Sequence, residues 1–315
     1  MRPLPLLFIF LLCGFGTGCD DPAEPKDTIG VSLLTTTNPF FKVIGDTITE
    51  EAEKHGYDTI VVSGDNDVAK QEAQLKDFIV RGVAAIVLCP CDSRSIGSAI
   101  REANEAGIPV FTADIACTDP NAKVVCHIAT NNLLGGKQAA QATIEILPDG
   151  GEVAIVDFKE VESCQQRVKG FKEIIDKHNA DNPAKMINVV AELPGEGDRE
   201  KGYKAAQDAL ESNPGLDAIF AINDPSALGA YAALEKAGAT ERITIIGFDG
   251  QPEGKQAILE GKIYADPIQR PGLIGRRTVE MIMRYRKGEE VPPLAEIDPE
   301  LYRLEDAKND PSLKH

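Results

Sequence analysis

Side chains that can form hydrogen bonds recur where the strand-like segments of this sequence end. In sheets of parallel strands covered by helices, small molecules bind outside the carboxyl ends of the strands. Carboxylates and amides at several such ends can bond to adjacent hydroxyl groups of one small polar molecule. The positions, one thiol among them, are Asn38, Cys89, Asp114, Asn223, Asp249 and Gln269.

Each of these positions also has a purely structural interpretation. Asn and Asp directly before a helix are frequent N-caps, and Asn38 before Pro39 and Asp92 before Ser93 are well placed for that role. Capping explains any one position, but it explains less well a set of polar strand ends in both halves of the chain.

Two aromatic residues, Phe40 and Phe41, directly follow Pro39. Sugars pack their C–H faces on aromatic rings while their hydroxyl edges bond to amides and carboxylates. Helical spacing also permits one ring to be buried in a hydrophobic core. We expect one ring in a binding cleft and the other partly in the core.

The elements that position these residues alternate between short β-branched runs and helical patterns. In segment 41–54, for example, Val43, Ile44, Ile48 and Ala52 follow helical spacing. Apolar strands that alternate with helices predict parallel sheets covered on both faces, and so many strands predict two doubly wound α/β lobes. The strand-like segments are 28–34, 58–62, 85–88, 109–113, 124–128, 153–156, 188–191, 218–221, 244–248 and 263–268.

Length and charge limit the classes of function. The 315 residues suffice for two lobes with separate cores. The 33 basic and 50 acidic side chains give a net charge of −17. Such an acidic chain repels phosphate backbones and anionic lipid headgroups, which argues against a nucleic-acid or peripheral membrane partner. The acidity is also explained by the solubility of an exported protein.

The first nineteen residues are typical of an export signal. Arg2 gives a positive start, and the apolar run 4–15 is too short to span a bilayer. Cys19 follows small residues, as in a bacterial lipobox, although Gly16 stands where that motif usually has Leu. We expect lipidation at Cys19, a tether over 20–26 and a periplasmic or cell-envelope location. An ordinary cleavable signal with an incidental Cys is the alternative.

Cysteine spacing leaves a disulfide open and disfavours a metal site. Cys117 and Cys126 flank a segment with turn-forming residues, so they are candidates for a disulfide in an oxidising compartment. Cys89 and Cys91 lack the spacing of redox or zinc motifs, and the four His residues are scattered. We expect no metal and no cofactor.

Several segments together resemble the ribose-binding protein family, the sugar-receptor branch of type I periplasmic binding proteins. They are Asn38 to Phe41, His127 to Asn132 with Gly135 to Lys137, Phe220 to Asp224, Ala227 to Ala230, and Gly247 to Gly250. The resemblance implies two Rossmann-like lobes joined by three crossovers that close on a sugar for an ABC permease or a chemoreceptor. It divides the chain into an N-terminal lobe of 27–129 with 270–297 and a C-terminal lobe of 130–269 with 298–315.

Carried over residue by residue, the resemblance implies ligand contacts from seven matching positions: Asn38, Phe40, Phe41, Asp114, Asn223, Asp249 and Gln269. Five positions depart from the ribose-binding pattern. Leu34 replaces Ser, Cys89 replaces Asn, Ile115 and Gln165 replace two ligand Arg residues, and Gly197 replaces a stacking aromatic. Arg167 matches a structural Arg, and Phe158 is a candidate replacement ring. Each lost charge-assisted bond is worth about 1.5–3 kcal/mol, so we expect a sugar or polyol other than ribose.

The sequence leaves other classes to be weighed. The same fold serves sugar-responsive repressors, but these begin with a helix-turn-helix. An exported enzyme is disfavoured because the chain has no nucleophile elbow, phosphate loop or His-anchored triad. We therefore expect a monomeric binding protein without catalytic activity. A receptor for a chemotaxis or two-component system in place of a permease stays open, since the binding chemistry is identical.

Overall fold

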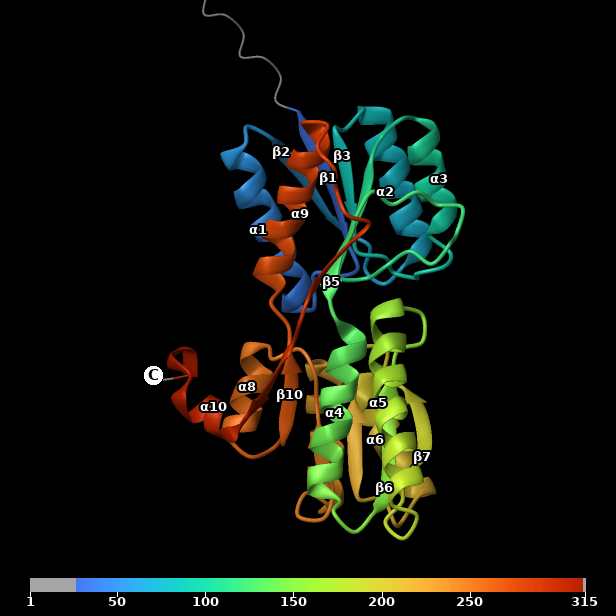
Figure 1. The fold of residues 1–315 in the computed structure, drawn as a ribbon, viewed down its shortest axis with the longest axis vertical. Helices are drawn as coiled ribbons and strands as arrows, with labels where there is room; N and C mark the ends of the chain where they lie inside the picture. Colours follow the sequence, from blue (N-terminus) through green and yellow to red (C-terminus); the bar gives the residue numbers. More distant parts are fainter. Residues whose placement is uncertain (1–26, 314–315) are drawn as a thin grey trace, which may run out of the picture.

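The computed structural model describes residues 27–313, which form two α/β lobes stacked along the long axis of the molecule (Figure 1). Each lobe contains a six-stranded sheet. The first sheet runs, in spatial order, through β11 (Leu294–Ile297), β5 (His127–Thr130), β4 (Val110–Ala113), β3 (Ala85–Leu88), β1 (Thr28–Leu33) and β2 (Asp58–Ser63). The second runs through β12 (Glu300–Arg303), β10 (Ala265–Ile268), β9 (Thr244–Ile246), β8 (Ala218–Ala221), β6 (Gly151–Asp157) and β7 (Ile187–Pro194).

Helices cover both faces of each sheet. In the first lobe, α1 packs on α9 and α2 packs on α3, and in the second, α4 packs on α5 (Figure 1). Helix α6 packs on α7 in the second lobe. The helices of the first lobe are α1 (Pro39–Lys54), α2 (Val68–Arg81), α3 (Gly97–Glu105) and α9 (Pro271–Arg286). Those of the second are α4 (Asn132–Ile146), α5 (Glu162–Asp181), α6 (Arg199–Ser212), α7 (Asp224–Ala237), α8 (Pro252–Leu259), α10 (Leu304–Asn309) and a final 3₁₀ turn (Pro311–Leu313).

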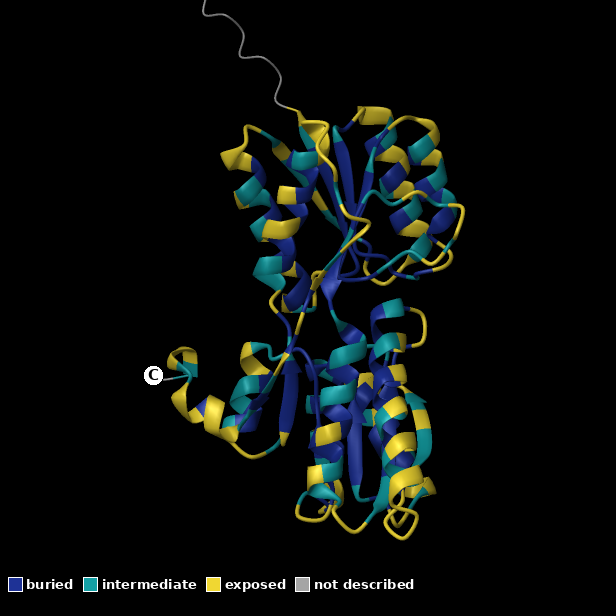
Figure 2. Cartoon of the chain, viewed as in Figure 1, coloured by how far each residue is buried: buried dark blue, intermediate teal, exposed yellow. Residues whose placement is uncertain are grey.

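The central strands are short and apolar because helices cover them on both faces. Every residue of β3, β4 and β8 is buried, whereas the edge strands β2 and β7 carry exposed residues (Figure 2). All strand pairs are parallel except β10 with β12. The fold confirms the two doubly wound lobes that the sequence predicts.

The chain passes between the two sheets at three places. It leaves the first sheet after β5 to enter α4, returns after β10 to enter α9, and crosses again between β11 and β12. Strands β11 and β12 were not among the predicted strands. They lie at the edges of the two sheets, and their sequences are mixed and partly exposed.

The disulfide between Cys117 and Cys126 that the sequence leaves open is not formed in the structure, in which both are free thiols. Cys126 belongs to the core cluster that includes Ile128, whereas Cys117 packs against a separate cluster around Ile96 and Ile100. The two thiols are therefore held in different layers of the first lobe. The export signal, Cys19 and the tether lie outside the described residues.

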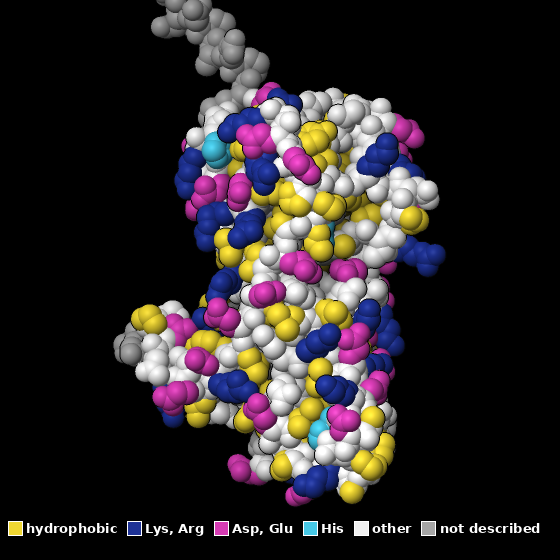
Figure 3. Space-filling view, viewed as in Figure 1, with side chains coloured by type: hydrophobic (Ala, Val, Ile, Leu, Met, Phe, Trp, Pro, Cys, Tyr) yellow, Lys and Arg dark blue, Asp and Glu magenta, His cyan; other side chains and the backbone are white. Residues whose placement is uncertain are grey.

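Charged side chains of both signs are interspersed on the face drawn in Figure 3. Within residues 27–313, no helix combines the length and the apolar character needed to cross a bilayer. The same residues contain no group of three or more His, Cys, Asp or Glu side chains arranged to hold a metal ion.

Candidate ligand-binding site

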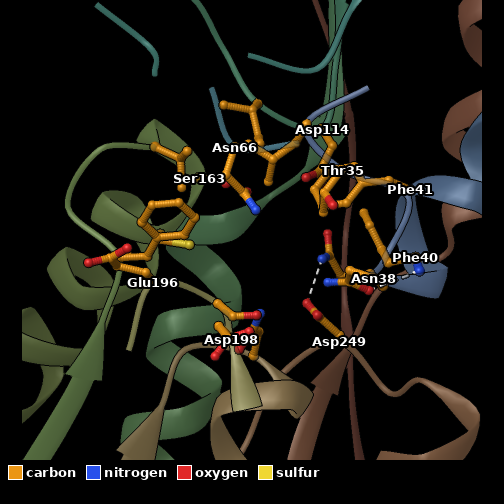
Figure 4. A pocket seen from close by; sticks show the side chains of 18 of the residues that line it. Thr35, Asn38, Phe40, Phe41, Asn66, Asp114, Ser163, Glu196, Asp198 and Asp249 are labelled. Carbon is orange, nitrogen blue, oxygen red and sulfur yellow. Dashed lines mark hydrogen bonds between the residues drawn. The ribbon is translucent and has the colours of Figure 1, made fainter. Parts of the chain in front are cut away.

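A cavity of about 70 Å³ lies between the two lobes, at the carboxyl ends of their strands. Labelled side chains from both lobes face this common space in Figure 4. The first lobe contributes Leu34, Thr35, Thr37, Asn38, Phe40, Phe41, Asn66, Asp114 and Ile115. The second contributes Phe158, Val161, Ser163, Cys164, Arg167, Glu196, Gly197, Asp198, Asn223, Asp249 and Gln269.

The start of α1 forms the aromatic wall of the cavity. Asn38 is the N-cap of this helix, and its Oδ1 accepts a hydrogen bond from the Phe40 backbone N–H at 3.0 Å. The rings of Phe40 and Phe41 meet edge to face, with centroids 5.3 Å apart. We expected one ring in the cleft and the other partly in the core. In the structure both rings line the cavity, and both are also buried.

Asp114 follows β4 and carries a carboxylate into the cavity. Its φ of 66° is in the left-handed region, which Asp tolerates better than most residues. The residue is 3% exposed, and its Oδ1 accepts no hydrogen bond from the described residues. Burial raises the pKa of Asp114 to about 7; the charge of Arg167 opposes the shift, and the charges of Asp249 and Glu162 add to it.

A buried ion pair forms the floor of the site in the second lobe. Arg167, on α5, donates from Nη1 to Asp249 Oδ1 at 3.1 Å. The same guanidinium donates to Asn132 Oδ1 and to the carbonyl oxygen of Ile222, and it stacks 3.8 Å from the centroid of Phe248. All the bonds described for Arg167 are to the protein itself, and they fix the position of its charge.

Asp249 is held by amides as well as by the guanidinium. Gln269 Nε2 donates to its Oδ1 at 2.7 Å, and Gln251 Nε2 donates to its Oδ2 at 3.2 Å. Burial raises the pKa of Asp249, and Arg167 with the two amides opposes that rise. The Oε1 atom of Gln269 is buried and accepts no hydrogen bond from the described residues, so it joins Asp114 as an unused acceptor.

Asn223 combines both interpretations that the sequence offers. Its Oδ1 caps α7 by accepting from the Ser226 backbone N–H at 3.1 Å. Its Nδ2 donates to the carbonyl oxygen of Gly197 at 3.3 Å, at the edge of the cavity. Capping and cavity lining are therefore properties of the same side chain.

The structure corrects two of the predicted contact positions. Gln165 is exposed on the outer side of α5, where its Nε2 donates to the carbonyl oxygen of Lys159 at 2.7 Å. Two residues along a helix are about 200° apart around its axis, so Arg167 faces the cavity and Gln165 faces away. Cys89 is fully buried in the core of the first lobe and is absent from the cavity lining.

The other departures from the ribose-binding pattern do lie at the site. Leu34, Ile115 and Gly197 line the cavity, and so does Phe158, the candidate replacement ring. Leu34 and Ile115 make part of the first-lobe wall apolar, and both are buried.

Several lining residues were not predicted as ligand contacts. Ser163, Cys164 and Arg167 share one face of α5 at positions i, i+1 and i+4, a helical spacing that was available in the sequence. Asn66 follows β2, a strand end like those selected. No comparable signal marks Glu196, which lies in the loop after β7 with a φ of 45°.

The lobes also touch directly at one lip of the cleft. The backbone N–H of Ser93, in the first lobe, donates to the carbonyl oxygen of Glu160 at 3.0 Å. The backbone N–H of Glu162, in the second lobe, donates to Ser93 Oγ at 2.8 Å. Because these bonds need the lobes in contact, the structure represents a closed arrangement.

Comparison with known proteins agrees with this architecture. Residues 29–290 match the periplasmic binding protein domain family, and the chain belongs to that family. It is 36% identical over 277 residues to the ribose import binding protein RbsB of Salmonella typhimurium, covering 88% of this chain and 90% of that protein. It is 31% identical over 268 residues to the D-apiose import binding protein of Paraburkholderia graminis, covering 84% and 83%.

A solved structure gives the same architecture. It is an ABC transporter solute binding protein from Bacillus halodurans with bound myo-inositol. The two structures superpose with a TM-score of 0.82 at 28% identity, over 90% of this chain and 96% of that one. The resemblance to type I periplasmic sugar-binding proteins, predicted from short motifs, is thereby confirmed over most of the chain.

Proposed function

We propose that this protein is a periplasmic receptor that captures a small sugar or polyol for an ABC importer. The observation that carries the proposal is the cavity between the lobes, which both lobes line with aromatic rings and buried hydrogen-bonding groups. The matched relatives, named as import binding proteins for ribose and D-apiose, support the same class of ligand. No catalytic step is part of the proposal.

Carbohydrate recognition suits the chemistry of the lining. Phe40 and Phe41 offer rings for the C–H face of a sugar, and Asp114 and Gln269 offer acceptors for its hydroxyl groups. Asn223 adds an amide donor from the second lobe.

Closure couples binding to transport in this proposal. A ligand that bonds to Asp114 in the first lobe and to Gln269 in the second interacts fully only when the lobes are together. It therefore shifts the population from open to closed by its differential affinity for the two states. The closed form is the one that a permease would recognise.

Ribose itself is not the ligand that we propose. At two positions where the ribose-binding pattern has hydrogen-bonding side chains, this cavity has the apolar Leu34 and Ile115. A ribose hydroxyl facing either residue would lose its partner in a buried site, at a cost of about 1–3 kcal/mol. The myo-inositol in the Bacillus halodurans structure and the apiose relative make cyclitols and other sugars the first candidates.

The cellular arrangement is also part of the proposal. We place the protein in the periplasm as a monomer, anchored through lipidated Cys19 and partnered by an ABC permease. A sensory receptor would have the same site, and the identity of neighbouring transporter genes separates the two arrangements.

A thermal-shift screen tests the function. The panel contains pentoses, hexoses, polyols and cyclitols, with D-ribose included, and the readout is the Tm of the purified protein. We expect at least one member other than ribose to raise Tm, because ligand that binds only the folded state stabilises it. A folded protein that no member stabilises would contradict the carbohydrate proposal.

A further inference from the structure

The charges that line the cavity are unbalanced. Four carboxylates line it, those of Asp114, Asp249, Glu196 and Asp198, but only one cation, Arg167. Glu196 pairs with Lys201 at the surface, and Asp198 is occupied as the N-cap of α6. The buried part of the cavity therefore contains two carboxylates, Asp114 and Asp249, and a single guanidinium.

The guanidinium of Arg167 forms its direct ion pair with Asp249 and acts on Asp114 only at longer range. Its Nη1 lies 3.1 Å from Asp249 Oδ1, whereas no ion pair joins Arg167 to Asp114 among the described residues. The other charged groups that act on Asp114 from the second lobe, Asp249 and Glu162, are both acidic. Ile115, its neighbour in sequence at the cavity wall, is apolar. Asp114 is thus a buried carboxylate to which no cation of the described residues is directly bonded.

Two buried acceptors in the cavity are unused. Asp114 Oδ1 comes from the first lobe and Gln269 Oε1 from the second, and neither accepts a hydrogen bond from the described residues. The two residues are 3% and 7% exposed, and both line the cavity. Leaving such acceptors unpaired in a buried site is unfavourable, most of all for a charged group. The bound molecule must therefore be rich in donors on the side that faces Asp114.

We propose that the ligand is an aminated sugar or aminocyclitol whose ammonium group binds to Asp114. This rests on the proposed function and specifies its ligand. An ammonium carries three donors and one positive charge, which brings the sum of Asp114, Asp249, Arg167 and ligand to zero. The hydroxyl groups of a neutral sugar can donate hydrogen bonds to Asp114, but they leave its negative charge without a compensating charge, which is costly in a buried site.

The ammonium also changes the titration of Asp114. Burial raises the pKa of this carboxyl to about 7, so the unliganded site is partly protonated near neutral pH. A bound cation favours the charged carboxylate and lowers its pKa. Binding of the amine near pH 6.5 should therefore release a proton, and the affinity should fall as pH drops below 7.

Isothermal titration calorimetry with matched pairs tests the inference on the wild-type protein at pH 7.5. The pairs are D-glucosamine with D-glucose, D-galactosamine with D-galactose, and scyllo-inosamine with scyllo-inositol. We expect at least one amine to bind ten or more times more tightly than its hydroxyl parent. Hydroxyl compounds that bind as tightly as their amines, or more tightly, would overturn this inference and leave the proposed function standing. Binding by neither series would overturn both.

Asp114→Asn separates the charge from the shape of the side chain. Asn tolerates the same positive φ and keeps an acceptor oxygen, so the preference for the amine should fall to within about threefold of the hydroxyl parent. Asp67→Asn is the matched control, because Asp67 caps α2 outside the cavity and Asn is an equally good cap. An undiminished amine preference in Asp114→Asn would refute the role of the carboxylate.

A second readout needs no variant. Titrations of the wild type with the preferred amine, repeated at pH 6.5 in buffers of different ionisation enthalpy, should reveal release of a fraction of a proton per ligand. Uptake of protons, or no exchange in any buffer, would contradict the proposed contact.

Discussion

Replacement of Arg167 by Met tests whether the buried ion pair holds the second lobe together at the site. Arg167 and Asp249 have side chains that are each 4% exposed, and their charged atoms are 3.1 Å apart. Met preserves much of the side-chain length but removes the charge and every donor. The substitution leaves Asp249 buried with only the amides of Gln269 and Gln251 as partners.

The expected loss of unfolding free energy in Arg167→Met is large. Breaking a buried pair by removing one partner costs about 3–5 kcal/mol, because the remaining charge has no compensation. Typical domains unfold with about 5–15 kcal/mol, so the variant should fold but unfold at a much lower urea concentration. The matched control is Arg199→Met. Its partner Glu253 is 3.4 Å away and both side chains are mostly exposed, so the loss should be about 0–1 kcal/mol.

The loss of stability in Arg167→Met should also depend on pH. Without Arg167, the folded-state pKa of Asp249 rises further above its unfolded value, so the folded protein binds a proton that the unfolded chain lacks. Stability then falls as pH rises through that window. Urea unfolding followed by circular dichroism should therefore show a greater deficit for Arg167→Met at pH 8 than at pH 5. Adding Asp249→Asn should recover part of the stability at pH 8.

Two results would refute this reasoning. One is a deficit at pH 8 no larger than that of Arg199→Met. The other is a double variant, Arg167→Met with Asp249→Asn, that is less stable than Arg167→Met alone at pH 8. Either result would mean that Asp249 is not a buried charge that depends on the guanidinium.

Three further substitutions test the closure, the packing and the buried acids. Ser93→Ala removes the Oγ that accepts from the Glu162 backbone N–H, about 1 kcal/mol of interlobe bonding. Because the free protein then populates the closed state less, ligand affinity should fall by up to about fivefold, and small-angle X-ray scattering should show a larger free protein to the extent that the free wild type is closed. Gly136→Ala places a Cβ 2.0 Å from a backbone oxygen of α5, so this variant should lose about 1–3 kcal/mol of stability in urea unfolding. The control Gly272→Ala should leave the stability unchanged, because the nearest atom to its Cβ is 3.5 Å away. Asp266→Asn removes a carboxyl whose pKa is raised to about 7 by burial. Folded wild type therefore loses stability as pH rises from about 4 to about 7, and the Tm of the variant should fall less over that range.

Each of these expectations has a contradicting outcome. Unchanged scattering and affinity for Ser93→Ala would mean that the lip contact does not stabilise closure. Equal losses of stability in Gly136→Ala and Gly272→Ala would contradict the claim that close packing of α4 on α5 requires glycine at position 136. A Tm of Asp266→Asn that varies with pH as in the wild type would show that this carboxyl does not titrate between the folded and unfolded states.

The lobes could be predicted because their signals are local. Buried strands such as β3 and β8 are continuous apolar runs, and the helices between them have a clear periodicity. Strands β11 and β12 lack such a signal. They are short, mixed in sequence and partly exposed, and they form because they extend the edges of sheets built by other segments. Pairing of that kind cannot be read from the four residues of either strand.

The site could be predicted where topology alone places a residue. Asp114, Asn223, Asp249 and Gln269 follow strands whose carboxyl ends meet at the cleft, and all four line the cavity. Gln165 could not be placed that way, because it is on a helix and the face that it presents depends on the exact phase of that helix.

The sequence also does not show whether a residue at a strand end enters the cavity or the hydrophobic core. Cys89 directly follows β3, as expected, but it lies in the core and not in the lining. The direction in which a strand-end side chain points depends on the local path of the backbone. A Cys side chain is compatible with the core and with a cavity, so its polarity does not predict that direction. For the same reason the sequence does not decide whether Cys117 and Cys126 form a disulfide. Turn-forming residues between them allow the chain to reverse, but they do not determine which core cluster each thiol joins.

The central claim is that one small ligand binds in the cavity through both lobes. The most direct test is calorimetric titration of the wild type and of Gln269→Leu with the compound that raises Tm most in the carbohydrate screen, because Gln269 Oε1 is the unused acceptor of the second lobe. We predict a single site in the wild type and about a tenfold loss of affinity in Gln269→Leu, since a buried hydrogen bond is worth about 1 kcal/mol or more, with Arg199→Met unchanged. Equal affinity in the wild type and Gln269→Leu would mean that the ligand does not bond to the second lobe at this position and would contradict the account.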